Sequence, residues 1–255
     1  MISILAKVLE KFTIEIIPNL PIFVRTPLYL NILKLRKVKD RLRFVATNKN
    51  PSFEERLDYA LDSRANLNNS GEKLHNFNSN VVLEEIKEGP VKIYKFIPPN
   101  SSKDKYCIYF HGGGYFAGSI TSHKNLISQI SNDSNLIIYF FEYRLSPEYN
   151  FPSAHEDAKL AVDFINTLHP DHQSIWIGES AGGGLATGLV VDKEYLEKPD
   201  NLILLSPWLD LSDGFEDKKF FKNSDVTIII EGMFEVGGFY AGDYGAKNPI
   251  LSPVY

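Results

Sequence analysis

The chain has 255 residues, enough for one sizeable domain, and its 44% hydrophobic and 23% charged residues are ordinary proportions for a globular protein. A single cysteine, Cys107, excludes an intrachain disulfide and fits a reducing compartment, so we expect a cytoplasmic protein. The sequence contains no phosphate-binding glycine loop with a lysine, no cluster of metal ligands and no nucleic-acid-binding module. We therefore expect no cofactor, no metal and no nucleic-acid partner.

The net charge of −5 conceals an asymmetry between the two parts of the chain. Residues 1–50 carry ten lysines and arginines against three acidic residues, whereas the remainder carries seventeen against twenty-nine. The basic residues concentrate in "LKLRKVKDRLR", residues 33–43. We interpret this stretch as the solvated face of a helix, and the alternative is attachment to an anionic surface such as a membrane.

Three helical patterns occupy the first part of the chain. "MISILAKVLEKFTIEII" has apolar residues at helical spacing, and its charges interrupt the run too often for a signal peptide or a membrane span. We expect an amphipathic helix that docks on the rest of the protein, with membrane-surface contact as the alternative. A second pattern covers about residues 28–45, and a third begins after Ser52, with Glu55 at capping-box spacing. Together they predict an N-terminal helical cap region over residues 1–79.

The pattern changes at about residue 80. "VVLEEI" and "VKIYKFI" flank a Glu-Gly-Pro turn and predict a β-hairpin. Apolar strands then alternate with helical stretches; the strands are "KYCIYF", "NLIIYFFEY", "SIWIG" and "NLILLS", and the helices are "SHKNLISQIS", "SAHEDAKLAVDFINTL" and "AGGGLATGLVV". Such alternation predicts an α/β fold over residues 80–255, with a mostly parallel sheet covered by helices on both faces.

"GESAGG", residues 178–183, lies between a predicted strand and a predicted helix. It fits the G-x-S-x-G pattern of a nucleophile elbow, in which glycines allow a sharp turn that lifts the serine above the sheet. The serine, Ser180, would stand at a helix N-terminus, where the helix dipole favours developing negative charge. Ser180 is therefore a candidate nucleophile for acyl transfer.

A run of three glycines follows an earlier strand in "FHGGGYFAGS", residues 110–119. Adjacent glycines are costly in backbone entropy, and they let bare backbone approach a ligand closely. Acyl transfer at Ser180 creates an oxyanion that needs backbone N–H donors, one of which would come from Ala181 and the others from a loop after a neighbouring strand. The glycine run is such a loop. A tight turn explains either motif alone, but not both motifs in this order, each after a strand.

With these two motifs, the chain resembles the hormone-sensitive-lipase-like branch of the α/β-hydrolases, which includes many microbial carboxylesterases. The matching stretches are "YFHGGGYFAGS", "EYRLSPEYNFPSAHEDA", "GESAGGGLA", "SPWLDLS" and "NPILSPVY". The resemblance runs from about residue 80 to the last residue, and the helical N-terminus is similar to the family's cap.

The resemblance assigns roles to residues of both motifs. It implies that Ser180 is the nucleophile, and that Gly113, Gly114 and Ala181 form the oxyanion hole for a small acyl ester. Residues that would support these motifs are His111, which would shape the loop, together with Gly112, Gly178 and Gly182.

The resemblance also implies roles outside the two motifs. Arg144, Glu148 and Asp157 would form a structural network, and Glu179, the variable position of the elbow, would hydrogen-bond locally. The family usually has asparagine where Gly184 stands.

The larger departure concerns the base and acid that a serine hydrolase needs. In this fold the order is serine, then acid, then histidine. Here no histidine follows His172, and the chain stops at Tyr255, before the positions at which the family carries both groups. We therefore expect a C-terminally truncated hydrolase domain whose last strands are missing. "NLILLS" would then be an exposed apolar edge strand, which invites a homodimer or a complementing fragment.

None of the remaining histidines is an obvious replacement base. His75 is interpreted as solvated, His155 as solvated or packed, and His169 and His172 as lying at the opposite end of the strand from Ser180. His123 lies near the glycine run and is the best of these weak candidates for a replacement base.

Three hypotheses remain open. The chain is a carboxylesterase-type serine hydrolase impaired by the absence of its triad acid and histidine, or a catalytically inactive protein that holds a small acyl or carboxylate ligand in the same pocket. The third is an interaction subunit whose basic N-terminus matters most. The aromatic residues Tyr115, Phe116 and Trp208 would line an apolar pocket or belong to the core.

Overall fold

The computed structural model describes residues 51–74, 76–87, 89–212 and 230–255. The chain divides into two compact units, residues 1–52 with 214–235 and residues 53–213 with 236–255, and the second contains the sheet. The two helices predicted for the first 45 residues, and the basic stretch at residues 33–43, lie outside the described residues. Within the described residues, no helix is long and apolar enough to cross a membrane.

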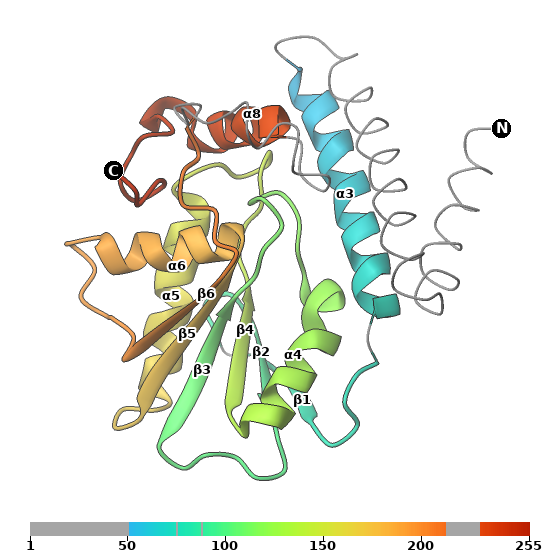
Figure 1. The fold of residues 1–255 in the computed structure, drawn as a ribbon, viewed down its shortest axis with the longest axis vertical. Helices are drawn as coiled ribbons and strands as arrows, with labels where there is room; N and C mark the ends of the chain where they lie inside the picture. Colours follow the sequence, from blue (N-terminus) through green and yellow to red (C-terminus); the bar gives the residue numbers. More distant parts are fainter. Residues whose placement is uncertain (1–50, 75, 88, 213–229) are drawn as a thin grey trace, which may run out of the picture. The chain divides into compact units, whose positions relative to one another are not determined.

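The second unit is built on a six-stranded sheet in the order β1-β2-β4-β3-β5-β6 (Figure 1). The strands are β1 (Val82–Ile86), β2 (Lys92–Ile97), β3 (Lys105–Phe110), β4 (Ile137–Glu142), β5 (Gln173–Glu179) and β6 (Asn201–Leu205). β1 and β2 form the expected antiparallel hairpin, and β2 pairs antiparallel with β4. β4, β3, β5 and β6 run parallel, which confirms the predicted mostly parallel sheet.

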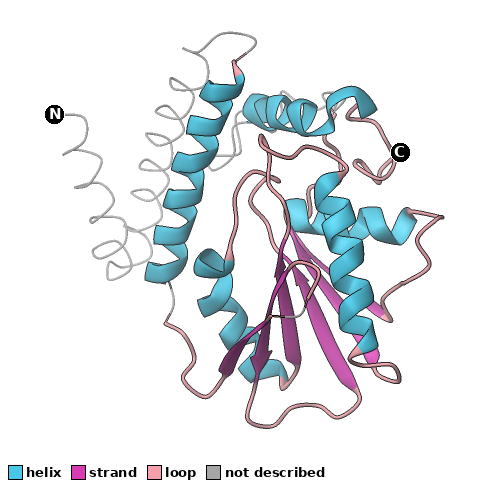
Figure 2. Ribbon diagram, turned by 180° about the vertical axis from the view of Figure 1, so that it is seen from behind, coloured by secondary structure: helices cyan, strands magenta, loops and turns pink. Residues whose placement is uncertain are grey.

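Helices cover both faces of this sheet (Figures 1 and 2). α4 (Ile120–Ser134) packs on one face, and α5 (Ser153–Thr167) and α6 (Ala181–Val191) pack on the other. Successive side chains of β3 point to opposite faces of the sheet, and each face has its own hydrophobic core. Ile108 packs in the core beneath α5 and α6, whereas Cys107 packs with Ile127 of α4. This period-2 alternation is what a doubly covered strand requires. Burial also raises the pKa of the Cys107 thiol, which behaves as a small hydrophobic residue, as expected.

α3 (Phe53–Leu74) begins directly after Ser52, where the sequence predicted a helix start, and packs along α4. At Gly71 the two helices come so close that any Cβ would collide with the backbone carbonyl of Ser122. The sequence did not predict α8 (Ile230–Ala241) or the short 3-10 helix η3 (Gly242–Tyr244). The fully buried Tyr240 of α8 stacks on Tyr115 with ring centroids 4.0 Å apart.

β6 lies at the edge of the described sheet, as the sequence predicted. Its residues alternate between exposed and half-buried, and the side chains of Ile203 and Leu205 are 44% and 41% exposed. An edge that combines unpaired backbone groups with exposed apolar side chains is prone to pair with another chain.

We predict that the protein associates through β6 and that Ile203→Lys weakens this association, because a charge on an edge strand opposes strand pairing. Light scattering over a range of concentrations measures the effect. Leu196→Lys is the matched control, because Leu196 is 84% exposed and lies outside the sheet. A monodisperse monomer whose amides at residues 201–205 exchange slowly would show that this edge is already covered.

Candidate active site

Ser180 occupies a sharp turn between β5 and α6, with φ 51° and ψ −119°. A positive φ is unfavourable for a residue with a side chain and costs on the order of 1–3 kcal/mol unless the surroundings enforce it. The surroundings here do so from β6 and the loop after it. Ser180 N–H donates to the carbonyl of Leu205 (3.0 Å), and its own carbonyl accepts from Trp208 N–H (2.8 Å). The turn leaves the Ser180 side chain half-buried at the carboxyl end of the parallel strands.

Close backbone contacts explain the glycines on either side of Ser180. A Cβ atom at Gly178 would lie 2.6 Å from Cα of Gly183, and one at Gly182 would collide with the carbonyl oxygen of Phe110. The latter contact seats the start of α6 against the end of β3, immediately before the glycine run.

The glycine run, residues 112–114, meets the elbow although more than sixty residues separate them in the sequence. A Cβ atom at Gly112 would lie 3.2 Å from Cβ of Ser180. Gly113, Gly114 and Tyr115 have φ values of 119°, 64° and 64°, so the loop makes three consecutive positive-φ turns beside the serine. Glycine takes up such values without steric penalty.

The glycine run and the start of α6 carry three backbone N–H groups that are unpaired within the described part of the chain. Among the residues that the structure describes, the N–H groups of Gly113, Gly114 and Ala181 donate no hydrogen bond, although the carbonyl of Gly113 accepts from Ala117 N–H (2.9 Å). For Ala181 this is expected, because the first residues of a helix have no intrahelical acceptor. Unsatisfied donors at a helix start and an adjacent loop favour a negatively charged ligand atom.

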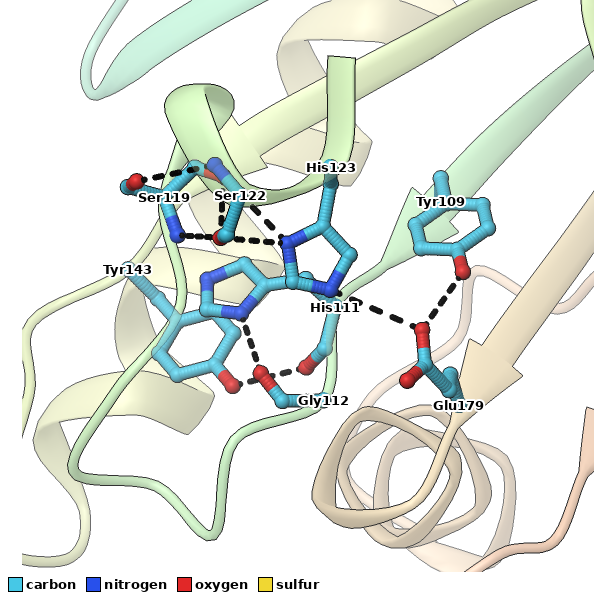
Figure 3. Close-up of polar contacts among 8 residues, drawn as sticks. All are labelled: Tyr109, His111, Gly112, Ser119, Ser122, His123, Tyr143 and Glu179. Carbon is cyan, nitrogen blue, oxygen red and sulfur yellow. Dashed lines mark hydrogen bonds and ion pairs between the residues drawn. The ribbon is translucent and has the colours of Figure 1, made fainter. Parts of the chain in front are cut away.

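His111 contacts the backbone of the glycine run at Gly112 (Figure 3). Its ring lies flat on that of Tyr143, with centroids 4.0 Å apart, and its Nδ1 lies 2.8 Å from the carbonyl oxygen of Gly112 and so carries the proton. The Tyr143 hydroxyl donates to the carbonyl of His111 (2.8 Å). Complete burial lowers the pKa of His111 to about 3, so the ring is neutral near neutral pH.

Glu179, the residue before Ser180, connects to two other elements (Figure 3). Its Oε2 accepts a hydrogen bond from the Tyr109 hydroxyl at 2.7 Å and lies 3.5 Å from Nε2 of His123. The hydrogen bond from His123, reinforced by that from Tyr109, keeps the pKa of Glu179 below its ordinary value despite burial. Glu179 thus hydrogen-bonds locally, as expected.

None of the five described histidines hydrogen-bonds Ser180. Both ring nitrogens of His123 are engaged, Nε2 with Glu179 and Nδ1 with the Ser122 hydroxyl at 2.8 Å. His155 is packed rather than solvated, with Nδ1 3.4 Å from the Tyr240 hydroxyl. His169 and His172 lie at the opposite end of β5, as expected, and His75 lies outside the described residues.

No described side chain hydrogen-bonds the Ser180 hydroxyl, and the described residues contain no cluster that could hold a metal ion. That Ser180 lacks a general base in the whole protein therefore stays a prediction.

Arg64 of α3 fastens the loop that carries the glycine run. Its Nε donates to the carbonyl of Phe116 (2.8 Å) and its Nη2 to the carbonyl of Ser146 (3.0 Å). Its Nη1 and Nη2 also reach the two carboxylate oxygens of Glu148, each at 2.7 Å. No local sequence pattern predicts this role for Arg64, because its partners lie more than fifty residues away in the chain.

The predicted network of Arg144, Glu148 and Asp157 needs a correction. Arg144 Nε binds Asp157 at 3.0 Å and its Nη2 binds Glu156 at 2.9 Å, but Glu148 pairs with Arg64 instead. The planar fork of Arg64 approaches Glu148 from α3, and the bidentate geometry accounts for the choice of partner.

The aromatic residues divide between core and site. Tyr115 is fully buried between Tyr240 and Trp208, whereas Phe116 and Trp208 are half-buried. At Gly184, where the family usually has asparagine, a Cβ would collide with the carbonyl of Trp208 and lie 2.9 Å from the Tyr115 hydroxyl. The packing of this chain therefore requires glycine there.

This fold and site define the class of esterase- and lipase-like α/β-hydrolases. Residues 107–255 match the model of a family described by the alpha/beta hydrolase fold, and because the match covers more than half of the chain, the chain belongs to that family.

Two of the relatives carry the names esterase and ethyl acetate hydrolase. The chain is 27% identical to an esterase of Acinetobacter venetianus over 165 residues, which cover 62% of this chain and 54% of that protein. It is 32% identical to an ethyl acetate hydrolase of Pseudomonas putida over 134 residues, which cover 48% and 42% of the two chains. The chain spans about half the length of the curated relatives that it matches.

Solved structures agree with the resemblance to hormone-sensitive lipase. A hormone-sensitive lipase from a metagenome library superposes with a TM-score of 0.73 at 29% identity, over 89% of this chain and 72% of that one. An esterase of the bacterial hormone-sensitive lipase family gives a TM-score of 0.70 at 24% identity, over 87% and 73%, which supports the fold.

We predict that Arg64→Met accelerates amide exchange in residues 113–119, because the substitution removes the bonds that tie Phe116 and Glu148 to α3. Exchange followed by mass spectrometry measures the change, which we expect to be at least about tenfold, since a charge-assisted hydrogen bond contributes about 1.5–3 kcal/mol. Lys124→Met is the control, because Lys124 of α4 makes a longer, 3.9 Å contact with Glu72 of α3. Equal exchange in Arg64→Met and wild type would contradict the role of Arg64.

We also predict that stability falls as the pH decreases from about 6.5 to 5. Burial lowers the pKa of His111 and of His155 to about 3, below the ordinary value of 6.5, so the unfolded chain binds more protons in this range. The stabilisation is therefore complete above pH 6.5 and declines below it, by up to about 1.4 kcal/mol per pH unit for each histidine. Urea unfolding at several pH values measures the slope, and His155→Gln is expected to reduce it. A flat profile between pH 6.5 and 5 would contradict the neutral, buried state of both rings.

Proposed function

We propose that this chain binds small carboxylic esters and that Ser180 is the nucleophile toward the ester carbonyl. The observation that supports this most strongly is a serine held at positive φ with the glycine run packed against it, where the N–H groups of Gly113, Gly114 and Ala181 donate no hydrogen bond within the described residues. A tetrahedral intermediate on Ser180 would place its oxyanion among these donors, which act where charge develops.

The electrostatics of the elbow favour the same reaction. Ser180 stands at the N-terminus of α6, so the helix dipole stabilises negative charge on the reacting oxygen. The esterase and ethyl acetate hydrolase names of the relatives support an ester as the substrate class.

We further propose that hydrolysis by this chain alone is slow. No described side chain hydrogen-bonds the Ser180 hydroxyl, and a serine without a general base is a weak nucleophile at neutral pH. In serine hydrolases that lack their triad, the oxyanion hole and substrate binding still leave about 10³–10⁴-fold acceleration over water. A residual activity of that order is expected here.

Hydrolysis of a short-chain nitrophenyl ester by the pure protein tests the rate. We expect turnover far below one per second, reduced further in Ser180→Ala. Turnover at ordinary enzyme rates that Ser180→Ala abolishes would show that a base reaches the serine.

Labelling with a fluorophosphonate tests the identity of the nucleophile. We expect slow modification that peptide mapping locates at Ser180 and that Ser180→Ala eliminates. Modification of another residue, or none after prolonged exposure at high reagent concentration, would overturn the assignment of Ser180.

The same observations favour a second candidate, a ligand-binding protein that holds a carboxylate or acyl group without cleaving it. Three free N–H donors and no base among the residues that the structure describes suit binding better than turnover. Calorimetry with short-chain carboxylates distinguishes the two: tight binding without ester turnover supports the binding protein, and turnover with weak carboxylate binding supports the hydrolase.

A further inference from the structure

We propose that Glu179 and His123 act as a latch that fixes the position of the glycine run relative to Ser180, and that both are positioning residues. The consequence for catalysis rests on the proposed ester chemistry, whereas the mechanical role stands on geometry alone. Neither residue is a candidate for direct contact with the substrate.

The latch connects the two motifs by a short path. Glu179 is the last residue of β5 and directly precedes Ser180, and His123 lies in the first turn of α4, which follows the glycine-run loop. The 3.5 Å contact between Glu179 Oε2 and His123 Nε2 therefore closes the gap between the elbow and the end of that loop. Figure 3 shows the two side chains facing each other across this gap.

Tyr109 fastens the other end of the loop to the same carboxylate. Tyr109 lies near the end of β3, just before the glycine run, and its hydroxyl donates to Glu179 Oε2 at 2.7 Å. Glu179 thus receives one partner from each side of the loop formed by residues 111–119. A single carboxylate holds the loop at its beginning and at its end.

The His123 end of the latch is itself held firmly. Nδ1 of His123 lies 2.8 Å from the Ser122 hydroxyl and 3.3 Å from the Ser119 carbonyl, and Ser119 and Ser122 form the capping box of α4. The His123 side chain is only 6% exposed, and its ring packs beside Tyr109 and Phe140. Rotation of the ring away from Glu179 would break this packing and the capping network together.

The glycine run also rests directly on Glu179. A Cβ atom at Gly112 would lie 3.1 Å from Glu179 Oε1 and 3.1 Å from its carbonyl oxygen, so the backbone of Gly112 packs on the backbone and carboxylate of Glu179. A shift of the carboxylate therefore shifts Gly112 and, with it, the free N–H of Gly113. The donors for the oxyanion depend on this contact for their distance from Ser180.

Amide hydrogen exchange over residues 112–119 tests the latch without any need for activity. We expect Glu179→Gln, which keeps the size and the acceptor for Tyr109 but loses the charge, to exchange at least about tenfold faster there than wild type. We expect His123→Gln to have a similar effect and the double variant to be no worse than either single variant, because both remove one interaction. Glu197→Gln is the control, since Glu197 accepts from Asn166 away from this loop.

Two results would overturn the proposal. One is unchanged exchange at residues 112–119 in a folded Glu179→Gln variant. The other is additive effects of the two single substitutions, which would mean that Glu179 and His123 act separately. Glu179→Asp keeps the charge on a shorter side chain, and we expect its amide exchange rate at residues 112–119 to lie between those of wild type and Glu179→Gln. This second variant keeps the test decisive if Glu179→Gln fails to fold.

The rate of fluorophosphonate labelling at Ser180 extends the test to chemistry. We expect Glu179→Gln to lower the maximal labelling rate by about 10–100-fold, with little change in the concentration of half-saturation, because misplaced donors fail to stabilise the transition state. A purely structural role would raise the half-saturation concentration or lower the melting temperature instead. If wild type shows no labelling at Ser180, the proposed function fails, while the exchange experiment still decides whether the latch exists.

Discussion

The backbone of Ser180, held at a φ of 51°, is the constraint on which the rest of the site depends. A serine does not adopt this conformation without support, and β6, the loop at Trp208 and the start of α6 all supply it. Because the turn is so tight, only glycine fits at Gly178 and Gly182, and Gly112 can then come within contact distance of the serine. The strain, the glycines and the unpaired N–H groups are thus consequences of one local geometry.

That geometry is maintained by polar contacts which arrive from outside the two motifs. Arg64 holds Phe116 and the loop at Glu148 from α3, and Glu179 receives Tyr109 and His123 from either side of the glycine run. His111 supports the same loop as a neutral ring stacked on Tyr143. A glycine-rich loop has unusual backbone freedom, and these contacts give it a defined position beside Ser180.

The sequence was sufficient to predict the elements and the motifs because both depend on local patterns. Strand alternation predicted β3 to β6 in order, and the glycines around Ser180 predicted the elbow, since sharp turns need residues without side chains. The edge position of β6 was expected from the resemblance, because the family has further strands beyond this one.

The sequence could not predict the contacts that depend on distant parts of the chain meeting in space. Arg64 has no recognisable pattern within α3, Glu148 pairs with it rather than with the nearby Arg144, and Tyr240 of α8 fills the core beside Tyr115. His123 was considered as a base because it lies near the glycine run, whereas the structure shows both its nitrogens bound to Glu179 and Ser122. The direction of a side chain decides whether His123 acts as a base or as a positioning residue, and that direction depends on the tertiary structure.

The most direct test of the central claim is to observe the three free N–H groups when a tetrahedral adduct forms on Ser180. A short alkylboronic acid forms such an adduct, and amide NMR resonances report hydrogen bonding at each N–H. The account predicts that the resonances of Gly113, Gly114 and Ala181 move together to lower field, and that Ser180→Ala shows no such shift. An adduct at Ser180 that leaves these three resonances unchanged would contradict it.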